Sequence, residues 1–532
     1  MDNVTDIWRD YQRGRDYLDS INLFSRAETS HNFVNGDQWN GLKFAGERPP
    51  HFNILKPIMK TSTALVGQNL MTIQYTSMNY GAGRKSLLDV CEMLNGHARK
   101  MWEKLKMDKL MWNVLEDAFI TGDSFLYFYE NGQEKDAQIL CELIDTTNIM
   151  FSDEQQQDIQ QQKYILIIQR KNIEDVKNMA RSYGMSEDDV ANIMPDDDTD
   201  LQINGKNEVK NNSKLTVIAK MWKKDGDVCV MRATKTAVIQ PETVITGLKR
   251  YPIAKYTWKP RKGTARGDGD IWDIIPNQIS INKSWYRLEQ TLKRTGYPLM
   301  GYKENALSAD QVSKLSYPGR TIAIKGNSNE SISSIIGYLQ PGSISPHAVA
   351  YPKDLITTTR ELEGSGDNLE NVNPEQASGT AIQAALEAKS LNVNKQVAAY
   401  KQVVEDIAWI WYDLLIAYNP NGITIHNDEP DAEGKYTYLI PKLVLDGLNV
   451  DIKVDATHSS QTYAAIKDAQ LKAMLDAGSI SFEEYVDSLG EDSTMPVEAF
   501  KKIVQHRREA ARQRVPVIPA VPGGMTNEMQ IL

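Results

Sequence analysis

Residues 363–418 read EGSGDNLENVNPEQASGTAIQAALEAKSLNVNKQVAAYKQVVEDIAWIWYDLLIAY and join a polar loop to a long amphipathic segment. Between Ile382 and Tyr418, apolar residues recur at steps of three, four and seven, which is the spacing of one helical face. We therefore predict a single helix over residues 379–418, about 60 Å long at the α-helical rise. Residues 363–378 are rich in Gly, Asn and acidic side chains, which is typical of a mobile loop.

The length and charge of the chain limit the kinds of protein it can be. Its 532 residues exceed the size that one hydrophobic core supports, so we expect several domains. The composition is that of a soluble globular protein, with a net charge of −10. An acidic total excludes a coat protein that is basic throughout, so any contact with nucleic acid is expected to be local.

The cysteines and the first residues carry no sign of secretion. Cys91, Cys141 and Cys229 lie far apart without a CxxC spacing, which favours buried free thiols over a disulfide framework or a zinc site. The first residues, MDNVTDIWRD, do not resemble a signal peptide, and the sequence has no run of about 18 apolar residues. We expect a protein made in a reducing cytoplasm, with no membrane contact.

Residues 1–264 mix helical and strand patterns, which predicts a composite α+β body. Helical patterns indicate helices at 5–29, 54–70, 85–106 and 109–121. Apolar runs bounded by turn residues indicate strands at 125–129, 138–144, 164–169, 215–222, 227–233 and 253–258. Asn131-Gly132 and Asp225-Gly226 are hairpin turn pairs within this set.

A locally basic window follows the body. Between Lys249 and Lys303, twelve Lys and Arg oppose four Asp and Glu. A helix is predicted over 270–295, with Asp270 as N-cap, Pro276 near the first turn and Gly296 as a stop. Its apolar face would hold Ile274, Ile281, Trp285, Leu288 and Leu292, and its opposite face Lys283, Arg287 and Arg294. The basic stripe is either a solvated outer face or a contact surface for an anionic polymer.

The remaining elements place a compact insert between two helices. Residues 297–345 form the insert, with a short helix at 309–315 and a strand at 321–325, and Pro352 can start a returning helix that runs through Leu362. After the long helix we predict strands at 422–426, 436–445 and 448–454, the last two joined at Asp446-Gly447. Helices follow at 460–477, at 482–489 behind a Ser481–Glu484 capping box, and at 497–514.

Motifs of common enzymes are missing from the sequence. It contains no GxxxxGK[ST], HExxH, GxSxG or GxGxxG, and its seven histidines are dispersed. The acidic run from Asp196 to Asp200 lacks the Gly and the final Glu of an EF-hand, so we interpret it as a solvated loop. We predict no catalytic residue, no cofactor and no metal site.

Five sets of residues occur in an order that is itself informative. They are Phe33-Val-Asn-Gly-Asp-Gln-Trp39 with Arg48-Pro49-Pro50 and Asn53; Ala118-Phe-Ile-Thr-Gly122-Asp123; Asp145-Thr-Thr-Asn-Ile149-Met-Phe-Ser-Asp153; Gly267-Asp-Gly269-Asp270 before a Pro276-containing helix with Gln278 and Asn282; and Ala377-Ser378-Gly379-Thr-Ala381-Ile382. Through these sets the chain resembles the portal proteins of tailed bacteriophages, over residues 30–490.

The resemblance implies an α+β fold, mainly α, with a wing, a stem, a clip and a crown. The implied parts are residues 1–264 as the N-terminal part of the wing, 265–296 as the first stem helix, 297–345 as the clip, 346–362 as the second stem helix, 363–378 as the tunnel loop, 379–458 as the long wing helix with its return strands, and 459–532 as crown helices with an extended tail. A short crown is implied, because no long helical pattern follows Arg514.

Portal proteins form rings, usually of twelve subunits, at one vertex of the capsid. The resemblance therefore implies a non-enzymatic virion protein, assembled in the host cytoplasm, whose ring is the channel for packaging and ejection of double-stranded DNA. The implied partners are further copies of the chain, DNA without sequence preference, the terminase, the major capsid or scaffolding protein, and the head-tail connector or tail proteins.

Two groups of site residues follow from the resemblance. The stem residues expected to set the potential of the channel are Lys283, Arg287, Arg294, Lys353 and Arg360. The tunnel-loop residues are Asp367, Asn368, Glu370, Asn371, Asn373 and Glu375. A loop without Lys or Arg suits sliding DNA, because each neutralised phosphate adds salt-sensitive affinity. On the long helix, Ala385, Ala388 and Ala399 offer a neighbouring subunit a close contact.

Two other interpretations stay open from the sequence. A DNA-processing enzyme could use scattered carboxylates and a metal ion, and metal-dependent nicking or ATP turnover would favour it. Another structural virion component, such as an adaptor, is the second. The insert between two helices argues against an adaptor, because adaptors are usually far shorter.

Overall fold

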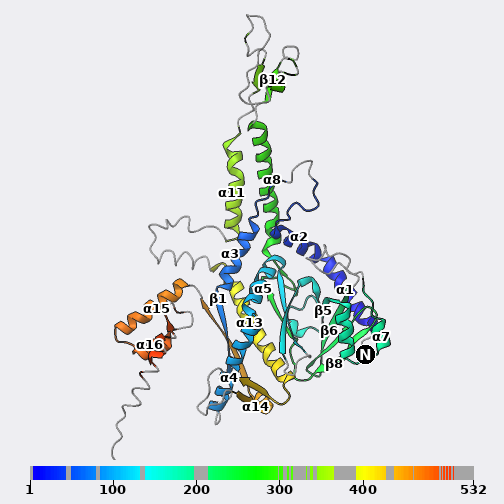
Figure 1. Cartoon of the computed structure of the whole chain (residues 1–532), viewed down its shortest axis with the longest axis vertical. Coiled ribbons are helices and arrows are strands. Elements are labelled where there is room, and N and C mark those ends of the chain that lie inside the picture. Colours follow the sequence, from blue (N-terminus) through cyan, green and yellow to red (C-terminus); the bar gives the residue numbers. More distant parts are fainter. Residues whose placement is uncertain are drawn as a thin grey trace, which may run out of the picture. The chain divides into compact units, whose positions relative to one another are not determined.

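The computed structural model describes residues 4–43, 49–78, 84–131, 138–196, 214–296, 299–302, 308, 310, 313–314, 331, 336–339, 344–364, 391–426, 437–458, 461–489, 493, 495–497, 499–500, 502–504 and 507. The chain separates into two compact units, Met1–Gly67 with Ile73–Asp455, and Gln68–Thr72 with Ala456–Leu532. Helices and several small sheets are mixed along it (Figure 1), which confirms the predicted α+β class.

Helices contribute more residues to the first unit than strands do. They are α1 (Val4–Ser20), α2 (Leu23–Asn35), α3 (Leu55–Gly67), α4 (Arg84–Lys104), α5 (Met107–Thr121), α6 (Ile173–Ser182), α7 (Glu187–Ala191), α8 (Asp270–Gly296), α11 (Pro346–Leu362), α13 (Asn394–Tyr418) and α14 (Lys442–Gly447), with the 3-10 turns η1 (Thr146–Asn148) and η2 (Ile159–Gln161).

Two larger sheets and four strand pairs accompany these helices. The sheet of order β4-β5-β6-β7-β8 contains Ile149–Phe151, Tyr164–Asn172, Lys214–Lys224, Asp227–Ala233 and Val238–Ile245. The sheet of order β3-β2-β9 contains Gln138–Ile144, Asp123–Asn131 and Ile253–Thr257. The pairs are β1 (Asn69–Ser77) with β16 (Val450–His458), β10 (Lys259–Pro260) with β11 (Gly267–Asp268), β12 (Leu299–Tyr302) with β13 (Ile336–Leu339), and β14 (Ile423–His426) with β15 (Thr437–Ile440).

The five-stranded sheet carries helices on both faces. Ile168 and Ile218 are cross-strand partners and pack against Ile7 of α1, whereas Val217 packs against Val176 of α6 on the other face. Successive strand residues point to opposite faces, so one apolar run supplies both layers of this core.

The three-stranded sheet packs against α5 and α13. Trp411 of α13 is buried, and its ring centroid lies 6.1 Å from that of Phe128 in β2 and 6.1 Å from that of Trp102 in α4. Both contacts are edge-on, the arrangement that aromatic rings favour. The amphipathic segment is therefore a central core helix of the first unit, from Tyr400 to Leu415.

The predicted single helix over 379–418 is wrong at one point. Leu391 is helical, but Asn392 and Val393 form a turn, and the continuous helix α13 begins at Asn394. Asn side chains compete for backbone hydrogen bonds and favour turns, so the apolar period continues while the helix does not. Residues 379–390 lie outside the described chain.

Four other predicted elements also differ from the structure. Helix α11 begins at Pro346, so Pro352 lies inside the helix and does not start it. The helix over 5–29 is divided into α1 and α2, because Asn22 adopts the left-handed conformation, with φ of 55°. Strand 436–445 stops at Ile440, since Pro441 precedes the short helix α14. Strand β16 accordingly pairs with β1 and not with β15.

Among the described residues of the second unit, α15 (Gln461–Asp476) and α16 (Phe482–Ser488) are continuous helices. The predicted capping box is present: Ser481 Oγ accepts from Glu484 N at 3.2 Å, and Glu484 Oε2 accepts from Ser481 N at 2.8 Å. Tyr485, Val486 and Val504 form the centre of its small core.

Candidate functional site

Helices α8 and α11 lie side by side in the first unit (Figure 1). α8 leads into β12, β12 pairs antiparallel with β13, and β13 leads back into α11, so the two helices are antiparallel. Of the predicted insert, the helix at 309–315 is described only in part, and the strand at 321–325 lies outside the described residues. We call α8 and α11 together the helix pair.

A buried amide network fixes the middle of α8 to two distant stretches of chain. Asn282 Nδ2 donates to Gln38 Oε1 at 2.6 Å, and Gln278 Nε2 donates to the Phe52 carbonyl at 2.8 Å. Gln278 Oε1 accepts from Ile54 N at 3.0 Å. Gln278 and Asn282 are 0% and 1% exposed, so neither side-chain amide contacts water. The hydrogen bonds within the network therefore satisfy their polar groups in place of water.

Glycines bring the start of α8 against the end of α5. Gly122 has φ of 104°, and a Cβ on it would lie 2.5 Å from the Gly267 carbonyl oxygen. A Cβ on Gly269 would lie 2.6 Å from the Phe119 carbonyl oxygen. Asp123 adds a bond between the same segments, since its Oδ2 accepts from Gly267 N at 2.7 Å. Only glycine allows the two backbones to approach this closely.

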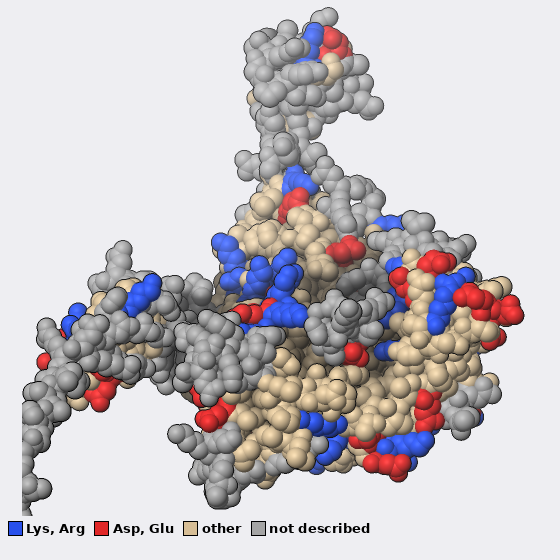
Figure 2. All heavy atoms as spheres, turned by 60° about the horizontal axis from the view of Figure 1, so that its bottom comes forward, with Lys and Arg blue, Asp and Glu red and all other residues tan. Residues whose placement is uncertain are grey.

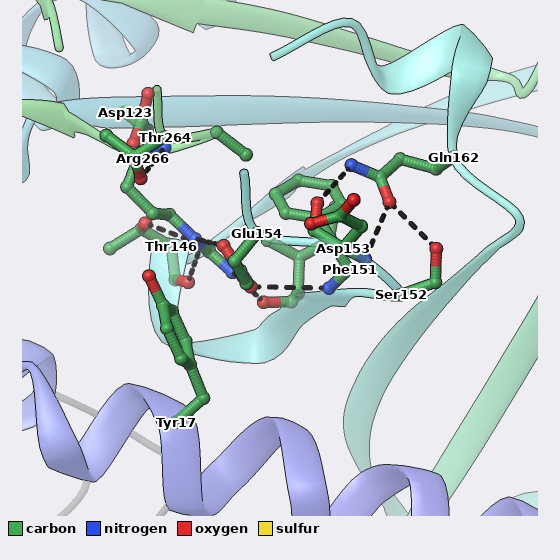
Figure 3. A network of polar contacts seen from close by, with 12 residues as sticks. Tyr17, Asp123, Thr146, Phe151, Ser152, Asp153, Glu154, Gln162, Thr264 and Arg266 are labelled. Carbon is green, nitrogen blue, oxygen red and sulfur yellow. Dashed lines mark hydrogen bonds and ion pairs between the residues drawn. The ribbon is translucent and has the colours of Figure 1, made fainter. Parts of the chain in front are cut away.

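Arg266, next to these glycines, holds the loop that follows β3 (Figure 3). Its guanidinium donates to the Thr146 carbonyl at 2.8 Å and to the Ile149 carbonyl at 2.7 Å. It also makes a two-point ion pair with Glu154, at 3.0 Å and 2.9 Å. The side chains of Arg266 and Glu154 are 3% and 9% exposed, so a charge and its partner are buried together.

Asp270 is the first residue of α8 and not the predicted N-cap. Its Oδ2 accepts from Trp258 Nε1 at 2.7 Å, and its Oδ1 pairs with Lys259. The carboxylate therefore ties the helix start to the chain after β9 and is not free to bind an α8 amide. Helix boundaries read from sequence are uncertain by one or two residues, which accounts for the difference.

Four of the five ordered residue sets thus meet around the start and the middle of α8. The set with Gln38 and Asn53 meets Gln278 and Asn282, and Asn53 Nδ2 also donates to the Val34 carbonyl at 2.8 Å. The sets at 118–123 and 145–153 meet the segment 266–270. The fifth set, residues 377–382, lies outside the described residues.

Replacing Gly269 by Ala is expected to lower the free energy of unfolding by about 2–3 kcal/mol, the cost of overpacking a close backbone contact. The added Cβ would lie within 2.8 Å of three backbone atoms of Phe119 and Ile120, which cannot move as a side chain can. Urea denaturation measures the effect. Gly96→Ala is the control: it lies within α4 with nothing within 4 Å of a Cβ, and should gain about 0.5–1 kcal/mol. A neutral Gly269→Ala variant would contradict the close packing.

The predicted cations of the helix pair differ in their surroundings. Lys283, Arg287 and Lys353 are exposed, and Arg360 is half-buried. The backbone of Arg294 is in α8, but its side chain lies outside the described residues. On α11, Asp354 follows Lys353 and Glu361 follows Arg360, so the positive stripe belongs to α8.

The apolar face of α8 was predicted correctly only in part. Ile274, Ile281 and Leu288 are buried, and Trp285 is half-buried with its ring centroid 4.7 Å from that of Phe52. Leu292, placed on the same face by its spacing, is 52% exposed. Its turn of α8 lies beyond the amide network, where α11 is the neighbouring helix.

The C-terminal end of α11 returns to the N-terminal end of α8. Burial, followed by the Asp270 carboxylate, raises the pKa of the Glu363 carboxyl to about 7, against the opposing effect of Lys259. Gly364, which follows, lies against Asn392, because a Cβ on it would meet Asn392 Nδ2 at 2.8 Å. The chain therefore leaves the helix pair and re-enters before α13 at neighbouring points.

The predicted tunnel-loop residues Asp367, Asn368, Glu370, Asn371, Asn373 and Glu375 lie outside the described residues. The described chain fixes where this segment starts and where the segment 365–390 ends, beside the base of the helix pair. Their predicted role remains a prediction.

A buried acidic group, missed by sequence reasoning, lies beside the same junction. Asp117 of α5 has a side chain that is 13% exposed, and its Oδ2 finds no hydrogen-bond partner among the described residues. Burial, followed by the nearby Asp145, raises the pKa of Asp117 to about 8. His31 Nε2 lies 3.9 Å from Asp117 Oδ1, and burial lowers the pKa of His31. The sequence feature that could have indicated this buried group is a carboxylate within the apolar run of α5.

Other candidate groups were checked among the described residues. Cys91 and Cys229 are buried free thiols, as predicted, and Cys141 is half-buried. Asp196 is not solvated as predicted, because it pairs with Arg170 and accepts from Thr216 N at 2.8 Å. In the described ranges, no three His, Cys, Asp or Glu side chains gather as metal ligands, and no helix is long and apolar enough to cross a membrane.

Comparison with known proteins gives no assignment. No protein-family model matches the sequence, and no curated protein matches it.

Proposed function

We propose that this chain is the subunit of a closed, non-enzymatic ring that conducts a nucleic acid. More specifically, we propose that it is the portal protein of a tailed bacteriophage, the channel through which double-stranded DNA is packaged and ejected. The observation that carries the proposal is the antiparallel helix pair, joined at one end by the β12–β13 strands and rooted at the other by buried polar contacts.

The rooting contacts support the proposal because they unite the residues that carry the resemblance. Residues 38 and 282 are far apart in the chain, yet their amides share a 2.6 Å hydrogen bond. Residues 123 and 267 are joined in the same way at 2.7 Å. A chance similarity of separate short stretches gives no reason for them to meet around one helix.

The charge of the helix pair suits a channel that DNA must leave as well as enter. Lys283 and Arg287 are exposed on α8, and the exposed carboxylate of Asp273 lies in the first turn of the same helix. Exposed cations attract phosphates and an exposed carboxylate repels them, so DNA would be held weakly along the axis. Under the proposal, α8 and α11 are the stem, the insert is the clip, and residues 363–378 are the tunnel loop.

The proposed partners follow from this role. They are further copies of the chain, double-stranded DNA, the terminase, the major capsid or scaffolding protein, and the head-tail connector or tail proteins, in a virion assembled in the host cytoplasm. The chain would supply no catalysis, and the motor activity would belong to the terminase.

Charge reversal on the helix pair tests the proposal. The triple variant Lys283→Glu, Arg287→Glu, Lys353→Glu should assemble like the wild type, because these side chains are exposed, while packaging of DNA falls several-fold. Native mass spectrometry measures assembly, and nuclease-protected DNA measures packaging. The matched control reverses the exposed Lys163, Lys249 and Lys453, which lie outside the helix pair. Loss of assembly, or equal packaging by both triples, would refute the assignment of these residues to the channel.

A further inference from the structure

A compact basic surface lies outside the helix pair, at the turn between α4 and α5. Arg99, Lys104, Lys106 and Lys109 are exposed there, and we call these four residues the basic patch. Lys104 and Lys106 are two residues apart, so their Cα atoms lie within about 7 Å of each other. Lys109 is one turn further along α5. On the face drawn in Figure 2, Lys and Arg side chains gather in several places among Asp and Glu side chains.

The patch is not neutralised within the described chain. None of its four cations has an ion-pair partner among the described residues, in contrast to Lys293, which pairs with Glu289 at 2.8 Å. Two exposed carboxylates belong to the same stretch: Glu103 precedes Lys104 in the sequence, and Asp108 accepts from Trp102 Nε1 at 2.7 Å, so the four cations outnumber them. The field of the turn also reaches His97, whose pKa is lowered by burial and by Lys100 and Lys104. The whole chain is acidic, so this local excess is not a property of the composition.

Folding alone does not account for these cations. Lys104 lies in the last turn of α4, where the helix dipole favours a cation. Lys106 and Lys109 lie at the start of α5, where the same dipole disfavours one by about 0.3–1 kcal/mol. Lys106 also adopts the left-handed conformation, with φ of 53°, which an ordinary side chain takes at a cost. Lys106 and Lys109 thus lower the local stability of the turn at the positions they occupy.

The turn that carries the patch is held firmly. Trp102 bridges it through Asp108, and the Trp102 ring packs against Trp411 in the core. Leu110 N donates to the Lys106 carbonyl at 3.2 Å and closes the first turn of α5. A fixed backbone with mobile lysine side chains presents several positive charges over a short distance.

We propose that the basic patch binds the phosphate backbone of double-stranded DNA, at a site separate from the channel. Three of the four cations are lysines, which act as point charges without the fork that reads a base edge, so the contact would be largely independent of sequence. A protein partner is less suited, since interfaces depend on buried aromatic and arginine anchors, and the patch offers one arginine and no aromatic residue. The exposed aromatic next to the patch, Trp112, already lies against Gly67. All four cations belong to one chain, so the site does not need a ring.

Binding of a 30-base-pair duplex, followed by fluorescence anisotropy over a range of salt, tests the inference. For Lys104→Gln, Lys106→Gln, Lys109→Gln, the slope of log K against log salt should become less negative by about three, one for each lost phosphate contact. The charge-reversed version, with Glu at the same positions, should weaken binding at least tenfold at low salt. Thermal unfolding shows whether the exposed substitutions leave the fold intact.

A matched triple gives the inference its control. Reversal of the exposed Lys163, Lys249 and Lys453 changes the net charge as much as the Glu triple does and should leave the duplex binding that the patch provides. Equal loss in this control, or an unchanged slope in the Gln triple, would overturn the inference. The inference would also be overturned if the Gln triple lost binding to poly-glutamate but kept its binding to DNA, because that result would identify an acidic protein as the ligand. Failure here leaves the proposed channel standing, because no patch residue belongs to the helix pair.

Discussion

Replacing Arg266 by Ala is expected to lower the free energy of unfolding by about 3–5 kcal/mol, the largest loss we expect from a single substitution here. The guanidinium makes two bonds to Glu154 and donates to the Thr146 and Ile149 carbonyls, all in a region from which water is excluded (Figure 3). The variant would leave the Glu154 carboxylate buried without its counter-charge. Urea denaturation of the isolated chain measures the loss.

The control and the intermediate variant make this prediction sharp. Arg261 has a side chain that is 52% exposed and pairs with Asp268 at 3.3 Å, so Arg261→Ala should cost less than about 1 kcal/mol. Arg266→Lys keeps the charge but not the two-point geometry and should fall between the two. An Arg266→Ala variant as stable as Arg261→Ala would contradict a structural role for this ion pair. Since Arg266 precedes the glycines at the start of α8, its loss should also reduce ring yield under the proposed function.

Replacing Asp117 by Asn is expected to stabilise the protein at neutral pH, by an amount that grows as pH rises. Burial, together with the nearby Asp145 and Asp123 carboxylates and against the opposing effect of Ser124, raises the pKa of Asp117 from 3.8 to about 8. His31, the near basic group, has a pKa lowered by burial and supplies little positive charge at neutral pH. Asn has the same shape without a titratable proton.

The sign follows from proton linkage. Below pH 3.8 the carboxyl is protonated in both the folded and unfolded states, and its full contribution to stability is present. As pH rises toward 8, the unfolded state ionises freely and the folded state does not, so the wild type loses up to about 1.4 kcal/mol per pH unit. The difference between Asp117→Asn and wild type should therefore grow by up to about 4 kcal/mol from pH 5 to pH 8.

Denaturation at several pH values measures this difference. Asp19→Asn, an exposed site on α1, is the control and should change stability by less than about 0.5 kcal/mol. A constant difference between Asp117→Asn and wild type over pH 5–8 would show that this carboxyl is ionised in the folded protein. The sequence offered no route to this prediction, because the burial depends on α2, whose His31 lies beside Asp117, packing against α5.

Local patterns were sufficient for elements whose chemistry is contained in a short stretch. Asp225 and Gly226 both have positive φ, as the hairpin between β6 and β7 requires. The Ser481 capping box and the stop of α8 at Gly296 are likewise local signals that the structure confirms. The basic and apolar faces of α8 followed from spacing alone, with Leu292 as the exception.

Element boundaries that depend on the conformation of a single residue could not be predicted from local sequence patterns. Asn22 and Asn392 end helices whose apolar period continues past them, and Pro441 converts the end of a predicted strand into the start of α14. The contacts of Gln278, Asn282 and Arg266 were also hidden, since their partners lie more than 100 residues away in the chain. Spacing identifies a face of a helix, but not the distant segment that covers it.

An averaged electron micrograph of the purified full-length chain tests the central claim most directly. A portal subunit should give closed rings of uniform subunit number. Each ring should surround an open bore of about 20 Å or more, wide enough for a DNA duplex to pass. Analytical ultracentrifugation at micromolar concentration should show the same assembly. A stable monomer, or a ring whose centre is closed, would contradict the account.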